Sequence, residues 1–126
     1  MSHKANYDKA VSVTVYSAAA DLDRGIAVTM NASAQVTPAA ANTVPNFITM
    51  APATFVGEAI QGAIPNGAIV AVKAGAAVSL GDVTTDANGK FVNATTGQNI
   101  VGTALTTADA VDEYIAIQFF PRGTVA

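Results

Sequence analysis

The stretch "DANGKFVNATTGQNIVGTALTTADAVDEYIAIQFF", residues 86–120, indicates the fold class most directly. In it, short runs rich in β-branched and aromatic residues alternate with turn sequences at Asn88-Gly89 and Thr96-Gly97. Asn-Gly is favoured in tight type I′ hairpins because both central residues of that turn need a positive φ. The stretch therefore predicts successive β-strands, and it contains no His, Cys or Ser that could act as a catalytic group.

The rest of the chain continues this pattern. From residue 54 onward, short β-rich runs follow one another at spacings of roughly ten residues, with turn sequences such as Pro65-Asn66-Gly67 between them. Apolar and polar residues also alternate over residues 11–16 and 26–30, which predicts two further strands with one buried face each. Residues 32–52 are rich in Ala, Thr, Asn and Pro, and we expect them to form mainly a loop. The fold class expected is all-β.

The length of 126 residues fits one ordinary domain. We expect a flexible N-terminal arm over residues 1–10 and a single β domain over residues 11–126. Residues 53–120 are the part of that domain with the clearest strand pattern.

Charge and composition argue against several classes of function. The net charge is −3 and only six residues are Lys or Arg, whereas nucleic-acid binding requires clustered basic residues. The most apolar window, residues 67–80, is too short and too interrupted to cross a membrane, and the polar N-terminus lacks the apolar core of a signal peptide. Charged residues make up only 12% of the chain, which suggests that another subunit or a partner covers part of the surface.

Two segments of the chain resemble one another. "FVGEAIQGAIPNGAIVAV", residues 55–72, aligns without gaps with "IVGTALTTADAVDEYIAI", residues 100–117. The apolar positions are kept, and the Val-Gly-x-Ala sequence recurs at the start of each segment. We interpret the segments as two related β units, each a strand, a connection and a returning strand, which together form a small closed or nearly closed barrel. Chance similarity between two Ala- and Val-rich segments is the alternative.

The chain offers few groups for catalysis or metal binding. His3 is the only histidine, and it lies in the polar N-terminal arm without a partner. The string from Thr84 to Gly89 resembles part of a calcium loop, but a Thr stands at its first ligand position and the closing Glu is missing. Glu58 is the only acid flanked by apolar strand residues, and a structural or interface role is favoured over acid catalysis. We expect no enzyme activity, no cofactor and no metal site.

Two adjacent aromatic residues, Phe119 and Phe120, lie on the last predicted strand. Neighbouring residues on a strand point to opposite faces, so one can fill the core while the other covers a neighbouring molecule. Together with Glu58, they are our candidate residues for a subunit interface.

Residues 54–120 resemble the small capsid decoration, or cement, proteins of tailed bacteriophages. The similarity lies in "IVGTALTTADAVDEYIAIQ", residues 100–118, where a Val-Gly-x-Ala strand leads through an Ala-rich link into a final apolar strand. It also lies in "GAIPNGAIVAVKAGAAVSLGDVTTDANGKFV", residues 62–92, which has a glycine turn, an apolar strand and a hairpin. Asp112 stands in the link where glycine is common in that family.

This resemblance implies a compact β-tulip or barrel-like protein on the outer surface of a phage head. Such a protein binds the major capsid protein, often as a homotrimer, and stabilises the expanded shell. The N-terminal arm and first strand could then order on the capsid by adding a strand to a neighbouring sheet, which makes Asn6, Tyr7, Val11 and Val13 candidate capsid contacts. A virion location without nucleic-acid or membrane contact is expected.

Other classes of protein fit the same features. A phage tail-tube or fibre subunit and an immunoglobulin-like adhesion module are also all-β and free of catalytic groups. An enzyme acting on carbohydrates through Glu58 and a nearby Asp ranks behind both.

Overall fold

The computed structural model describes residues 11–126, and this part of the chain consists of β-strands joined by turns and loops, with no helix. The all-β prediction is confirmed. The predicted arm over residues 1–10, with His3, Asn6 and Tyr7, lies outside the described residues. The ten strands are β1 (Ser12–Tyr16), β2 (Ala27–Met30), β3 (Val36–Pro38), β4 (Phe47–Thr49), β5 (Ala59–Ala63), β6 (Ile69–Lys73), β7 (Gly81–Thr85), β8 (Phe91–Asn93), β9 (Gly102–Ala104) and β10 (Tyr114–Phe119).

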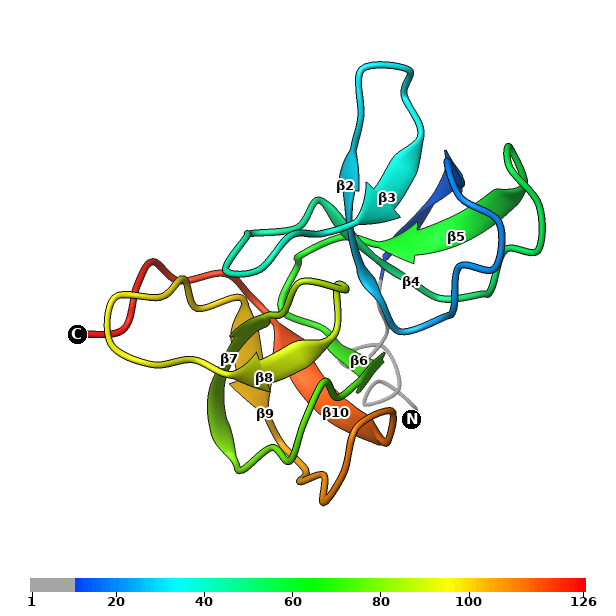
Figure 1. The fold of residues 1–126 in the computed structure, drawn as a ribbon. Coiled ribbons are helices and arrows are strands. Elements are labelled where there is room, and N and C mark those ends of the chain that lie inside the picture. Colours follow the sequence, from blue (N-terminus) through cyan, green and yellow to red (C-terminus); the bar gives the residue numbers. More distant parts are fainter. Residues whose placement is uncertain (1–10) are drawn as a thin grey trace, which may run out of the picture.

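The strands form two five-stranded antiparallel sheets that occupy separate parts of the molecule (Figure 1). The first sheet has the order β1-β5-β4-β2-β3, and the second has the order β6-β10-β9-β7-β8. The edge strands are β1 and β3 in the first sheet and β6 and β8 in the second, and in each sheet a single parallel bridge joins the end of one edge strand to the other. The chain thus divides its strands between two sheets and does not close them into one barrel.

The two sheets have the same topology. Replacing β1 to β5 by β6 to β10 in chain order converts the first strand order into the second. The isolated bridges repeat as well, because the parallel bridge from Ser17 to Val36 has its counterpart at Ala74 to Phe91. The molecule therefore consists of two structurally equivalent units, which we call the first unit (residues 11–64) and the second unit (residues 68–120).

This duplication differs from the repeat predicted from the sequence. That repeat matched β5 and β6 with β9 and β10, but β5 and β6 belong to different sheets, whereas β9 and β10 pair with each other. The prediction that residues 55–72 form one returning unit is therefore wrong. The true counterpart of β5 is β10. In this alignment of the two units, Glu58 is equivalent to Glu113 and Ile60 is equivalent to Ile115. The backbone confirms this alignment, because the Ser17 N–H donates to Glu58 O at 3.0 Å and the Ala74 N–H donates to Glu113 O at 2.8 Å.

The turn at Asn88-Gly89 joins β7 to β8, as the sequence predicts, but its type differs. Gly89 has a φ of 74°, whereas Asn88 does not adopt a positive φ, so the turn is not type I′. The Gly89 N–H donates to Asp86 O at 3.3 Å, and the Asp86 side chain accepts hydrogen bonds from the N–H groups of Asn88 and Lys90. This is a three-residue hairpin loop, in which one left-handed residue follows a turn. A side-chain acceptor at Asn31 orders the equivalent turn of the first unit in the same way.

Residues 32–52, expected to be mainly loop, contain the short strands β3 and β4. Both pair with β2, and β4 also pairs with β5. Ile48 on β4 is fully buried, so this segment contributes to the core and does not merely cover it.

The hydrophobic core crosses the boundary between the units. One cluster of buried side chains contains Phe91 and Phe119 of the second unit together with Ala27, Ile48 and Ala63 of the first. A smaller cluster, with Val15, Leu22, Ile26, Val28, Val36, Ala53 and Ile60, lies within the first unit alone. The first unit therefore completes its packing against the second.

Candidate interaction surface

The described residues contain no group of three or more His, Cys, Asp or Glu side chains close enough to hold a metal ion. Within residues 11–126 no helix is long and apolar enough to cross a membrane. The calcium-like string from Thr84 to Gly89 forms the end of β7 and its hairpin turn. There the Asp86 carboxylate accepts hydrogen bonds from the backbone N–H groups of Asn88 and Lys90. The features of this part of the protein that remain to be considered are its surfaces and a small pocket.

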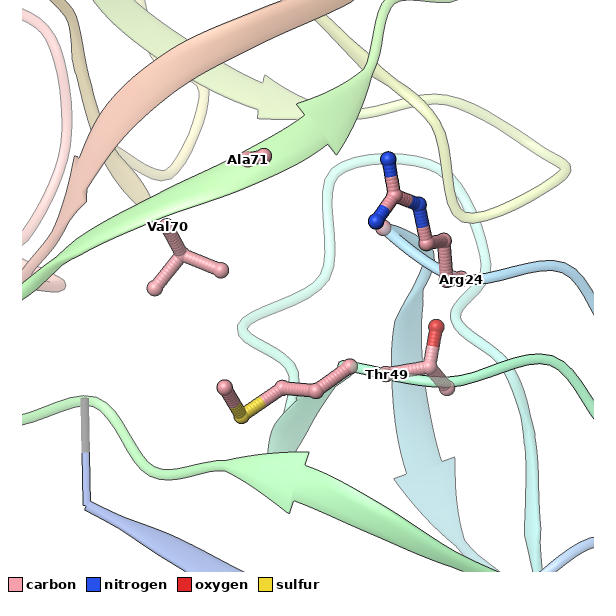
Figure 2. A pocket seen from close by; sticks show the side chains of 6 residues that line it. Arg24, Thr49, Val70 and Ala71 are labelled. Atoms are coloured by element: carbon pink, nitrogen blue, oxygen red, sulfur yellow. The ribbon is translucent and has the colours of Figure 1, made fainter.

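The pocket has a volume of about 130 Å³ and lies between the two units (Figure 2). Arg24, Gly25, Thr49 and Met50 line it from the first unit, and Val70 and Ala71 line it from β6. Pockets that hold small-molecule ligands are usually about 300–1,000 Å³, so this hollow is too small for most of them. It is better described as a gap in the packing of one unit against the other.

Charged and aromatic side chains join the units beside this pocket. The Lys73 ammonium lies 2.9 Å from a carboxylate oxygen of Asp23, and this hydrogen bond raises the pKa of Lys73 above its ordinary value. The guanidinium of Arg24 lies 4.8 Å from the centre of the Tyr114 ring, within range of a cation–π interaction. The Lys73 backbone N–H also donates to Gly25 O at 2.9 Å. These contacts fix the edge of β6 against the first unit.

Glu58, predicted to lie on a strand, precedes β5 and orders the loop before it. Its carboxylate accepts hydrogen bonds from the Thr54 N–H at 2.7 Å and from the Thr54 hydroxyl at 3.1 Å. These bonds, led by the one from the Thr54 backbone, lower the pKa of Glu58 below its ordinary value. In the second unit, Glu113 accepts the Asp109 N–H at 2.8 Å in the same position. The recurrence shows that Glu58 has a local structural role, and its proposed interface role stays a prediction.

Phe119 and Phe120 lie on opposite sides of the chain at the end of β10. Phe119 is fully buried in the shared core, whereas Phe120 is exposed. Of the pair, only Phe120 has the surface needed to contact another subunit directly.

The edge strand β1 carries the described part of the predicted capsid contacts. Val11, which precedes the strand, and Val13 are exposed, and so is Tyr16 at its end. Val15, by contrast, is buried in the core of the first unit, to which β1 belongs. β1 pairs with β5 on one side, and its outer edge meets another strand of residues 11–126 only just past its end, where Ser17 bridges Val36 of β3. An exposed apolar edge strand is a site at which another chain can add.

The second unit carries exposed apolar residues that the sequence analysis did not single out. Leu80 and Leu105 lie in the loop before β7 and just after β9, respectively, and both side chains are exposed. Leu80 ends the most apolar window of the sequence, which was interpreted only as too short for a membrane span. Its position before Gly81 was the available signal, since a large apolar residue in a turn is often a surface residue.

A solved structure shares this fold over nearly its entire length. The crystal structure of the head fiber gp8.5 N base in bacteriophage phi29 superimposes with a TM-score of 0.73, covering 94% of this chain and 99% of that chain, at 20% sequence identity. No protein-family model matches the sequence, and no curated protein sequence matches it. At this level of identity the likeness shows a common fold.

Proposed function

We propose that this chain is a structural protein of a bacteriophage head, which binds the outer surface of the capsid and stabilises the expanded shell. The observation that carries the proposal is the likeness in fold, over almost all of both chains, to a protein described as the base of a phage head fiber. The major capsid protein is the expected partner, and the expected assembly is a homotrimer. A symmetric shell multiplies a weak contact, because the same contact recurs at every equivalent position.

The described surface is suited to such a role. Large apolar side chains are exposed on both units, among them Val13, Tyr16, Leu80, Leu105 and Phe120. Exposed apolar residues on a chain with only 12% charged residues favour contact with other proteins.

The test is co-sedimentation of the purified protein with expanded, undecorated heads from its own source. We expect saturable binding at a fixed ratio to the major capsid protein. Binding that does not saturate, or no binding by protein shown to be folded, would contradict the proposal.

The similar structure favours a second function of the same class, because that protein is the base of a head fiber. In this alternative the chain is the base that attaches a fibre to the head, and stabilisation of the shell is incidental. Electron microscopy of decorated heads separates the two, because a fibre base places extended density above each binding site. Heat resistance that is equal with and without the bound protein would also favour the fibre base.

A further inference from the structure

The contact between the two units provides a template for a contact between two molecules. In the internal contact, β6 of the second unit lies against a patch of the first unit formed by Arg24, Gly25, Thr49 and Met50 (Figure 2). The Lys73 N–H, at the end of β6, donates to Gly25 O across this contact. One unit thus presents an edge strand, and the other presents the patch that covers it.

Each unit possesses both of these surfaces, because the units are equivalent. The strand β1 of the first unit corresponds to β6, so Val13 corresponds to Val70 and Tyr16 to Lys73. The antiparallel bridges between Leu22 and Ala53 and between Val78 and Ala108 align the patches. The second unit is one residue shorter than the first between this bridge and its next strand, so Leu80 takes the place of Arg24 and Gly25.

Met50 and Leu105 are aligned in the same way. The Met50 N–H donates to Gln61 O, and the Leu105 N–H donates to Ala116 O, each at 2.8 Å. The second unit therefore has a patch of its own, formed around Leu80 and Leu105. Within residues 11–126, β1 and this second patch are the two corresponding surfaces that the contact between the units does not use.

The exposed fractions of equivalent side chains differ between the two units, and the surfaces outside the internal contact are the more exposed ones. Val70, which lines the pocket between the units, is 7% exposed, whereas its counterpart Val13 is 39% exposed. On the unused patch, Leu80 is 63% exposed and Leu105 is 45% exposed. Both surfaces are apolar, and they correspond to surfaces that already fit one another inside the molecule.

We propose that β1 of one molecule docks against the Leu80 and Leu105 patch of a second copy, in a head-to-tail contact that repeats the internal contact between units. This inference specifies the interface of the homotrimer in the proposed function and rests on that proposal for the number of copies. A head-to-tail contact uses two different surfaces, so it closes into a ring or extends into a filament. A trimer requires that it close.

The chemistry of this contact differs from that of its internal template. The ion pair of Lys73 with Asp23 has no counterpart, because Tyr16 stands in place of Lys73 and only Ser79 and Leu80 lie between Val78 and Gly81 in the second unit. The contact between molecules is therefore mainly apolar, and we expect the association to persist at high salt concentration, where surface ion pairs are screened.

Single-cysteine variants test the geometry, since the natural chain has no cysteine. Tyr16→Cys and Leu80→Cys are made as separate proteins and treated with a short bis-maleimide, each alone and as a mixture. The head-to-tail contact brings residue 16 of one copy near residue 80 of another. Covalent dimers are expected in the mixture and not in either protein alone. Dimers in either protein alone to the same extent, or none in the mixture, would overturn the proposal.

A second pair of variants tests the energetics by sedimentation equilibrium without capsids. Leu80→Glu should weaken self-association by about tenfold or more, because it places a charge in an apolar contact. The matched control is Phe55→Glu, which changes an equally exposed apolar residue at 59% exposure, and it should leave the association unchanged. An unaltered association of Leu80→Glu, or a wild-type protein that stays monomeric, would overturn the interface.

Binding to heads is measured separately for the same proteins. If the wild-type protein self-associates through this interface but does not sediment with heads, the capsid role fails and the interface stands. If wild type binds heads but remains monomeric in solution and on the shell, the interface fails and the capsid role stands.

Discussion

At the scale of the residue, the contact between the units explains why residue 89 is a glycine, whereas the turn that contains it does not require one. The equivalent position in the first unit is Ala34, which adopts a φ of 60°, so the turn itself tolerates a side chain. Gly89 accepts a hydrogen bond from the Ala27 N–H at 2.8 Å across the boundary between the units. A Cβ at Gly89 would lie 2.5 Å from Ala27 O and 2.8 Å from a methyl group of Ile26, which leaves no space for it.

We therefore predict that Gly89→Ala destabilises the protein more than Gly97→Ala does. Gly97 also has a positive φ, of 85°, but a Cβ there meets nothing within 4 Å. Gly97→Ala should cost only the left-handed conformation, about 1–2 kcal/mol. Gly89→Ala should add the cost of overpacking, about 1–3 kcal/mol. Urea unfolding measures both, and equal losses would show that the space around Gly89 relaxes without cost.

At the scale of the element, Thr85 holds β7 to the first unit through its backbone carbonyl, which accepts the Asn42 N–H at 2.9 Å, and through its hydroxyl. Thr84 and Thr85 are adjacent on this strand and both are buried. The Thr85 hydroxyl lies 2.8 Å from Ala40 O, to which it can donate, and it accepts the Thr43 N–H at 3.0 Å. The Thr84 hydroxyl has no hydrogen-bond partner among the described residues. Making the same substitution at both positions therefore compares the stability lost with a hydrogen-bonded hydroxyl and the stability lost with a hydroxyl that has no partner.

Thr85→Val should lower the free energy of unfolding by about 1–3 kcal/mol, because it leaves the backbone N–H of Thr43 without its acceptor. Thr84→Val should be neutral or stabilising, since it replaces a buried hydroxyl that makes no hydrogen bond with a methyl group of similar size. Chemical denaturation of the two variants against wild type gives the comparison. A loss of stability at Thr84 equal to that at Thr85 would contradict the assignment.

Elements with a strong local pattern could be predicted from the sequence, and elements defined by distant pairing could not. The alternation over residues 11–16 and 26–30 corresponds to β1 and β2, and the turn at Asn88-Gly89 corresponds to the β7–β8 hairpin. The strands β3 and β4 have three residues each, and Pro38 ends β3, so neither segment shows a periodic pattern. Their partners lie elsewhere in the chain and supply the hydrogen bonds that make them strands.

The duplication was hidden for a similar reason. Between equivalent strands, the residues kept are mostly small or β-branched, such as Val28 and Val83. A chain rich in such residues also matches itself by chance in other alignments, and the predicted repeat over residues 55–72 was one of them. The equivalence is expressed in backbone hydrogen bonds and bridges, which do not depend on side-chain identity. For the same reason, the sequence could point to Leu80 as a surface residue, but its place beside Leu105 in one patch follows only from the equivalence of the units.

At the scale of the whole molecule, the shared core couples the stability of the two units. The cluster within the first unit contains Ile60, whereas Ile117 belongs to the cluster that both units build. Ile48 and Ala63 of the first unit are buried in the cluster that both units share. Unfolding of either unit therefore exposes apolar surface of the other. The prediction of a single domain over residues 11–126 then takes a measurable form, which is a single cooperative transition.

We predict that Ile60→Ala and Ile117→Ala, each costing about 2–5 kcal/mol, lower the midpoint of the same transition. The two variants are compared in a Leu80→Glu background, so that dissociation of copies does not coincide with unfolding. Calorimetry should give equal calorimetric and van't Hoff enthalpies for both, because the units unfold together. If Ile60→Ala instead produces an early transition and leaves a later one unshifted, the first unit unfolds independently. The contact between units would then be weaker than its buried side chains imply, and the same contact between molecules would be weaker still, because association also costs translational and rotational freedom.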